Sequence, residues 1–332
     1  MARVLVLGGG GFIGSNLCEN LLENGHQVRI LGRPNLQMFW SPETLEKIEI
    51  FFGDLTNTEE VGPALKAQDT VYHLVSTTLP KSSNDNPAYD VQSNVVGTIN
   101  FLETAHKVGV RHVIFVSSGG TVYGIPQQLP IPETHPTDPI CSYGISKLAI
   151  EKYLALFSQL HGLRYTVLRI SNPYGRYQRA NSGQGAISVF LNRAMSGQPI
   201  EIWGDGSVVR DYIHISDVAS AMVSVLAYNG DETIFNLGSG IGHSLNQIVE
   251  AVATAIGSNV DVIFRSARSL DVPANVLDIS RIKAALHWRP RVLLDDGIAR
   301  TIDWLLKSTR ESRTAHVDQP FDHQQSRPSS KS

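Results

Sequence analysis

The sequence predicts an α/β protein: a doubly wound parallel sheet followed by a smaller lobe in the C-terminal half. Two observations support this fold class. Short apolar runs alternate with helical patterns through residues 1–171, as in layered α/β structures. After residue 171 the apolar runs become shorter, and loops rich in Gly, Asn and Pro separate them.

The first half contains apolar runs that are typical of strands buried on both faces of a sheet. These predicted strands are Val4–Leu7, Val28–Leu31, Ile48–Phe52, Val71–Val75, Val113–Val116 and Tyr165–Ile170. Apolar residues at helical spacing predict helices between and after them. The predicted helices are Phe12–Glu23, Val95–Lys107 and Tyr143–Leu160.

The second half contains fewer and shorter elements. Strands are predicted at Ile200–Trp203, Ile213–Ile215 and Ile234–Leu237. A helix begins at Leu245, because Ser244 and Gln247 form a capping box before an apolar stripe. We expect residues 1–171 to form the sheet domain, with some later segments returning to it. Residues 172–308 then form mainly the lobe, and the polar residues 309–332 form a disordered tail.

The composition excludes several classes of protein. Hydrophobic residues make up 42% of the 332, which is enough for a large core and argues against disorder. The net charge of −3 argues against a nucleic-acid-binding face. Two cysteines, Cys18 and Cys141, exclude a disulfide framework and a cysteine-built zinc site, and no apolar run reaches the ~18–20 residues of a membrane helix. We therefore expect a cytoplasmic protein without a metal site, a nucleic-acid partner or a membrane anchor.

A glycine run follows the first predicted strand and precedes the first predicted helix. Gly8, Gly11 and Gly14 have the spacing of a turn that a pyrophosphate can approach, since no Cβ is in its way. The start of the following helix offers free N–H groups and a positive dipole end to the phosphates. This context predicts a dinucleotide cofactor in a Rossmann-type fold.

The end of the second strand leaves the kind of dinucleotide open. NAD-binding folds usually carry an acid there for the ribose hydroxyls, but this chain has Gly32 followed by Arg33. Arg33 either accommodates a 2′-phosphate or is a solvated loop residue, so we expect NAD with NADP as the alternative. Asp54 follows the third strand, where it either accepts a bond from the adenine amino group or caps a turn.

Tyr143 and Lys147 are four residues apart on a predicted helix and therefore share a face. An ammonium beside a phenol favours the phenolate and lowers the pKa of the tyrosine from its usual ~10. Tyr143 is thus a candidate general acid and base. Ser118 lies just beyond a strand's carboxyl end, where open α/β sheets bind ligands. Ser118 either holds a reacting hydroxyl group against Tyr143 or simply forms a turn.

Together these motifs resemble the extended short-chain dehydrogenase/reductases, and within them the NAD-dependent epimerase/dehydratase family with its UDP-hexose 4-epimerases. The resemblance runs from Arg3 to about Lys307. It implies that Ser118, Tyr143 and Lys147 are the catalytic residues. The cofactor contacts that it implies, besides the candidate Arg33, are Gly8, Gly11, Phe12, Ile13, Gly14, Asp54, Leu55, Leu74, Asn94, Tyr143 and Lys147.

The resemblance also implies a nucleotide-sugar substrate, with UDP as the nucleotide. Two arginines suit a doubly charged diphosphate. Besides Ser118 and Tyr143, the implied contacts are Asn172 in the diphosphate loop, Trp203 beside the uracil, Arg210 and Arg268 on the diphosphate, and Asp271 on the ribose. Asn275 occupies the position that borders the sugar pocket. A tyrosine there restricts the family's enzymes to plain hexoses, so the smaller Asn275 leaves room for an N-acetyl group.

The residues before Val122 distinguish the reactions within the family. Dehydratases carry Asp-Glu there and decarboxylases a glutamate, whereas this chain has Gly120 and Thr121, which cannot act as acid and base. The resemblance therefore implies a nucleotide-sugar 4-epimerase for UDP-hexoses, with UDP-N-acetylhexosamines as further candidates. Tyr143 removes the proton of the 4-hydroxyl while C4 gives hydride to bound nicotinamide. The 4-keto sugar then turns and takes the hydride back on its other face.

Two departures from the family pattern concern the cofactor and support alternatives. Besides Gly32, Thr78 stands where the sugar epimerase often has a lysine. Gly32 and Arg33 favour, as an alternative, an NADP-dependent reductase of a nucleotide-linked 4-keto sugar. A third hypothesis is a non-catalytic dinucleotide sensor, against which the Tyr143 and Lys147 pair argues. We expect a homodimer in each case.

Overall fold

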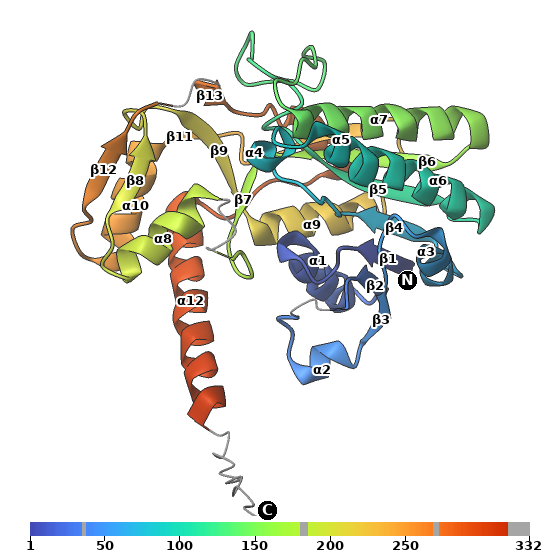
Figure 1. The fold of residues 1–332 in the computed structure, drawn as a ribbon, viewed down its shortest axis with the longest axis horizontal. Coiled ribbons are helices and arrows are strands. Elements are labelled where there is room, and N and C mark those ends of the chain that lie inside the picture. Colours follow the sequence, from blue (N-terminus) through green and yellow to red (C-terminus); the bar gives the residue numbers. More distant parts are fainter. Residues whose placement is uncertain (35–37, 180–184, 268–271, 318–332) are drawn as a thin grey trace, which may run out of the picture.

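A parallel sheet of seven strands lies at the centre of the part of the chain that the structure describes (Figure 1). This computed structural model describes residues 1–34, 38–179, 185–267 and 272–317. The sheet has the order β10-β6-β5-β4-β1-β2-β3, and its neighbouring strands are parallel. Its strands are β1 (Arg3–Leu7), β2 (Gln27–Gly32), β3 (Ile48–Phe52), β4 (Thr70–His73), β5 (His112–Ser118), β6 (Arg164–Ile170) and β10 (Ile234–Leu237). The predicted fold class is confirmed.

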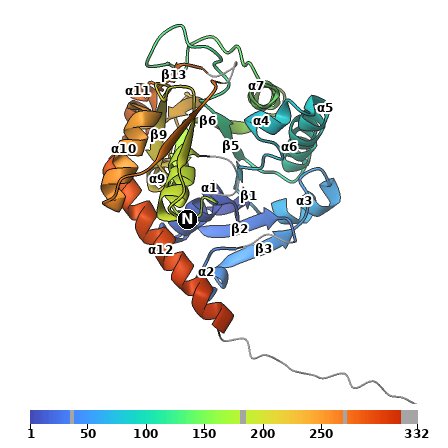
Figure 2. The ribbon, with the colours of Figure 1, turned by 60° about the vertical axis from the view of Figure 1, so that its left-hand side comes forward.

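Helices cover both faces of this sheet, because the strand residues that point to either face are apolar. Val4 and Val6 belong to the core under α1 (Phe12–Glu23), α9 (Ile215–Val225) and α11 (Ser280–Leu286). Leu5 and Leu7 belong to the opposite core, under α3 (Thr58–Leu65), α6 (Gly97–Lys107) and α7 (Ser142–His161). Figure 2 shows α9 on one side of β5 and β6, and α6 and α7 on the other.

The strand order reverses between β1 and β4, and this is where open α/β sheets bind ligands. Short helices occupy the connections near this point. They are α4 (Pro80–Ser83), α5 (Pro87–Asp90) and a π-helix, η1 (Val91–Val96), that leads directly into α6, whereas another short helix, α2 (Pro42–Leu45), lies between β2 and β3 at the edge of the sheet. The sequence predicts an ordinary helix from Val95, so the π-helical turn is an unexpected feature.

The smaller lobe is built around a core of its own. Strand β9 (Val209–His214) pairs with β7 (Asn172–Tyr174), β11 (Gly242–Ser244) and β13 (Ala274–Asn275). A second pair of strands is formed by β8 (Ile200–Trp203) and β12 (Val262–Arg265). The helices of the lobe are α8 (Ala186–Met195), α10 (Leu245–Ile256) and α12 (Leu294–Val317).

Besides α11, two segments of the second half return to the sheet. Strand β10 extends it beside β6, and α9 packs on α1. The capping box before α10 is present, with Ser244 Oγ accepting from the Gln247 N–H at 3.2 Å. Helix α12 continues to Val317, across residue 309 where the predicted tail begins. Among the described residues, no helix has the length and apolar character needed to cross a membrane.

Candidate active site

The glycine turn after β1 has the geometry of a dinucleotide cradle. Gly8 has a φ of +81°, which favours glycine. A Cβ on Gly14 would lie 2.4 Å from the Gly8 carbonyl oxygen, and one on Gly9 would lie 2.3 Å from the Ile30 side chain. The turn can therefore fold this tightly only with glycines. Gly9, which is absent from the predicted contacts, is as necessary for the packing as Gly14.

The N-terminus of α1 lies directly at this turn. Gly11 is the N-cap residue and supplies no side-chain cap, so the first N–H groups of the helix, at Phe12 and Ile13, keep their capacity to bind phosphate oxygens. Leu74, whose N–H donates to the Leu7 carbonyl at 3.1 Å, follows β4 beside the same turn. These residues fit a dinucleotide whose pyrophosphate lies over the turn.

The ends of β2 and β3 bring Arg33 and Asp54 together. Arg33 Nε lies 3.9 Å from Asp54 Oδ2, and both side chains are exposed to a large extent. Hydrogen bonds from the N–H and hydroxyl of Thr56 lower the pKa of Asp54. Asp54 therefore closes a turn, as one sequence-based interpretation predicts, while its second oxygen faces Arg33. Leu55, the next residue, is buried.

Tyr143 and Lys147 lie together on the first turns of α7, at the carboxyl edge of the sheet. Lys147 Nζ donates to the Val116 carbonyl at 3.0 Å and lies 5.5 Å from the centre of the Tyr143 ring. Burial raises the pKa of Tyr143 to about 12, while a hydrogen bond with Ser76 opposes the rise. Burial also lowers the pKa of Lys147 to about 8. The lowered tyrosine pKa expected from the sequence is thus not present, because desolvation outweighs the hydrogen bond with Ser76.

Ser118 ends β5 and begins the turn that faces α7. The Thr121 N–H donates to the Ser118 carbonyl at 3.3 Å. The turn can approach α7 because Gly144 has no side chain, since a Cβ there would lie 2.7 Å from the Thr121 carbonyl oxygen. Thr121 Oγ1 is buried and has no hydrogen-bond partner in the part of the chain that the structure describes. The turn that contains Ser118 and Thr121 therefore lies close to the helix that carries Tyr143.

Asn94 lies within η1 and is buried. Its Oδ1 accepts from the Thr77 N–H at 3.0 Å, and its Nδ2 donates to Asp90 Oδ1 at 2.9 Å. Asn94 therefore fixes the loop after β4, which contains Ser76, the hydrogen-bond partner of Tyr143. The predicted role of Asn94 at the cofactor stays a prediction.

Apart from Ser118 and Tyr143, the predicted substrate residues come from the lobe. Asn172 donates to the Asp211 carbonyl at 3.0 Å, and Trp203 ends β8 with 43% of its surface exposed. Arg210 on β9 is the register partner of Asn275 on β13. Asn275 is only 1% exposed, and its Nδ2 donates to the Gly119 carbonyl at 3.1 Å. The lobe is therefore joined to the turn after β5. Arg268 and Asp271 lie outside the described residues.

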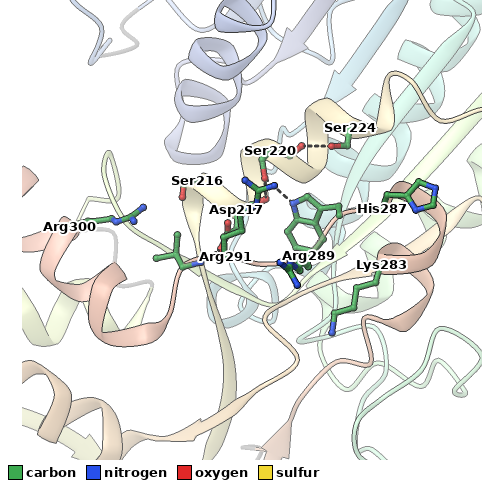
Figure 3. A pocket seen from close by; sticks show the side chains of 11 residues that line it. Ser216, Asp217, Ser220, Ser224, Lys283, His287, Arg289, Arg291 and Arg300 are labelled. Carbon is green, nitrogen blue, oxygen red and sulfur yellow. Dashed lines mark hydrogen bonds between the residues drawn. The ribbon is translucent and has the colours of Figure 1, made fainter.

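A separate cavity of about 890 Å³ lies between α9, α11 and the start of α12 (Figure 3). Its lining is rich in basic and hydroxyl side chains: Lys283, His287, Arg289, Arg291, Arg300, Ser216, Ser220 and Ser224. The Asp217 carboxylate fixes the segment on one side of the cavity, because it accepts hydrogen bonds from the backbone N–H groups of Arg291 and Val292. The predicted site residues do not line this cavity, so it is separate from the candidate site.

A glycine cradle, a helix start and a Tyr–Lys pair at one sheet edge define a class of protein: nucleotide-cofactor enzymes that oxidise and reduce a carbinol. The model of the NAD dependent epimerase/dehydratase family matches residues 4–238. The chain therefore belongs to that family, and the resemblance seen in the sequence is confirmed.

Individual proteins with related names are also similar to this chain over most of its length. The crystal structure of a UDP-glucose 4-epimerase from Thermotoga maritima, with UDP-glucose, has a TM-score of 0.86 and 33% identity, covering 92% of this chain and 99% of the other. A UDP-glucose 4-epimerase from Thermus thermophilus, in complex with NAD, has a TM-score of 0.83 and 34% identity over the same shares. A dTDP-4-dehydro-6-deoxyglucose reductase from Escherichia coli is 35% identical over 317 residues, or 92% of this chain and 97% of the relative.

Proposed function

We propose that this protein is an NAD-dependent nucleotide-sugar 4-epimerase that acts on UDP-hexoses. The observation that carries the proposal is the pairing of Tyr143 with the buried Lys147 at the sheet edge that also holds the glycine cradle. The similarity over nearly the whole chain to two UDP-glucose 4-epimerases supports it.

Tyr143 is the group that moves the proton in this proposal. As phenolate it takes the proton of the sugar 4-hydroxyl when the sugar is oxidised, and as phenol it returns the proton when the ketone is reduced. Lys147, protonated and bonded to the Val116 carbonyl, favours the phenolate form. Bound NAD supplies the hydride acceptor and, in its oxidised form, a positive charge. The hydroxyl of Ser118 orients the reacting hydroxyl group.

The lobe holds the nucleotide part of the substrate in this proposal. Arg210 and Arg268 bind the diphosphate, Asp271 the ribose and Trp203 the uracil, while Asn172 lies in the adjoining loop. A substrate that is held by its nucleotide leaves its sugar free to turn, which epimerisation requires. Asn275, in place of a larger residue, allows an N-acetyl group at the sugar pocket.

The test is an incubation of the purified protein with UDP-glucose, UDP-galactose and their N-acetyl forms, without and with added NADPH. Formation of the C4 epimer without added cofactor is the expected result, because the cofactor is regenerated in each cycle. Absence of any epimer, with the protein folded and NAD bound, would contradict the proposal.

A specific observation favours a second candidate function, the reduction of a nucleotide-linked 4-keto sugar. The relative from Escherichia coli is a reductase of this kind, and Arg33 follows Gly32 at the end of β2. Consumption of NADPH with a 4-keto sugar, and no epimer from the UDP-sugars, would support the reductase over the epimerase.

We further propose that the protein forms a homodimer and acts in the cytoplasm. Helix α7 carries an exposed apolar stripe that includes Ile145, Leu156 and Leu160, which a second copy could cover. Cys18 and Cys141 are free thiols, which suits a reducing compartment. Light scattering of the parent and of Leu160→Glu tests the dimer, since a charge on the stripe should yield monomers.

A further inference from the structure

Asp90 is a buried carboxylate at the end of α5, and it contacts α7. Its exposed fraction is 0%. Oδ1 accepts from the Thr78 hydroxyl and from Asn94 Nδ2, and Oδ2 accepts from Ser142 Oγ at 2.8 Å and Ser146 Oγ at 2.7 Å. An ionised carboxylate offers about four acceptor positions, so four donors satisfy it completely. No donor in this set is charged.

The two serines that bond Asp90 directly precede the two candidate catalytic residues. Ser142 precedes Tyr143, and Ser146 precedes Lys147. Residues four apart lie on one face of a helix, so one carboxylate oxygen holds consecutive turns of α7 at once. This contact fixes the rotation of the helix about its axis, and with it the direction of Tyr143 and Lys147.

The same segment also binds the backbone at the start of α7. The N-cap residue Cys141 gives no side-chain cap. Instead, Asn84 Oδ1 accepts from the Ser142 N–H at 2.9 Å, and Ser83 Oγ accepts from the Tyr143 N–H at 3.0 Å. Residues 78–94 thus satisfy helix-start donors that would otherwise lack partners. Asp90 leads directly into η1, and π-helical turns are frequent at functional sites.

Asp90 also acts on the charge of the buried lysine. The negative charges of Asp90 and Glu151 raise the pKa of Lys147, against the lowering by burial. His73 also lies near Lys147, but burial lowers the pKa of His73 to about 3, so His73 is neutral near pH 7. Removal of the Asp90 charge would therefore lower the pKa of Lys147 further.

We propose that Asp90 is a positioning residue of the reaction: its carboxylate holds Ser142 and Ser146, and so fixes the first turns of α7 so that Tyr143 and Lys147 act together. The proposal rests on the epimerase function proposed above. Asp90 contacts neither reacting group in this role and acts through the helix.

The test is Asp90→Asn, which keeps the shape of the side chain and removes its charge. We expect kcat for the preferred UDP-sugar to fall by about 10- to 100-fold, as for a small misplacement of a reacting group, with little change in KM. The alkaline limb of the kcat profile should move to lower pH, because Lys147 loses its proton earlier. Hydrogen exchange of the amides at residues 142–147 should become faster. Asp90→Glu keeps the negative charge and should therefore return the alkaline limb to its position in the parent protein.

Asp69→Asn is the matched control, since Asp69 pairs with Arg3 and Arg111 away from the site. It should leave the pH profile and the exchange of α7 unchanged. A folded Asp90→Asn protein with the parent's kcat, pH limb and exchange would overturn the proposal. If Asp90→Asn does not fold, Ser146→Ala decides, because it removes one donor and keeps the carboxylate; parent values would again overturn the proposal. A parent protein without epimerase activity would contradict the proposed function instead, and the exchange measurement would still test Asp90.

Discussion

The sheet side and the lobe side of the candidate site are held in different ways. On the sheet side, Lys147 is 5% exposed, and the Glu151 carboxylate on the same helix bonds both Ser117 of β5 and Arg169 of β6. On the lobe side, Trp203 is 43% exposed, and Asn275 Oδ1 is buried without a partner among the described residues. The helix of the acid–base groups is therefore tied to the sheet by buried bonds, while Trp203 on the lobe side is open to solvent. This difference suits a reaction in which the sugar turns and the proton-transfer group does not.

The largest effect is expected on the sheet side. Tyr143→Phe removes the hydroxyl that transfers the proton and should lower kcat by roughly 10²–10⁴-fold. Because the phenyl ring still fills the same space, the fold and the affinity for NAD should change little. Turnover and the NAD dissociation constant are the measurements. Near-normal turnover in a folded variant would show that Tyr143 is not the catalytic group.

The pH dependence separates the two sides. Lys147 has a pKa of about 8, so it is a cation below that pH and neutral above it. We expect kcat to fall as the pH rises through about 8, approaching a tenfold loss per unit. Binding of UDP should not follow this change, because the guanidinium of Arg210 stays charged. Measurement of kcat and of the UDP dissociation constant between pH 6.5 and 9.5 checks this. If both quantities changed together with pH, the two sides of the site would not differ in this way.

Asn275 tests the lobe side. A tyrosine at this buried position would fill space near the sugar and should lower kcat/KM for UDP-N-acetylhexosamines about tenfold or more relative to the plain hexoses. Asn275→Ala, which loses the bond to the Gly119 carbonyl without adding bulk, is the control. The ratio of the two kcat/KM values is the measurement. Equal losses for both substrates would show that Asn275 does not select between them.

The smallest effect is expected at Arg33, whose side chain is 65% exposed. Arg33→Asp should move the ratio of NADP and NAD dissociation constants toward NAD. We expect a change of roughly two- to fivefold, because exposed charge pairs contribute ~0.2–1 kcal/mol. Titration of both cofactors into parent and variant gives the ratio. An unchanged ratio would mean that Arg33 does not contact the 2′ position.

The fold was predictable where short-range patterns determine it. Apolar runs mark the strands because these are buried on both faces, and the capping box marks the start of α10 because its bonds join residues three apart. The Tyr143 and Lys147 pair was visible because one helical turn separates them. The contacts around Asp90 were not visible, since its bonds to Ser142 and Ser146 span 52 and 56 residues. The raised pKa of Tyr143 depends on burial, which no local motif reports.

The path of the chain between the sheet and the lobe limits how this protein can be divided or recombined. A fragment that ends at residue 171 would lack α9, and so would uncover the side of α1 on which α9 packs. It would also lack β10, and the edge of β6 would be open to pairing with other chains. A substrate lobe therefore cannot be exchanged between relatives as one terminal block. A workable chimera would keep α9, β10 and α11 with the sheet and exchange only the segments between them.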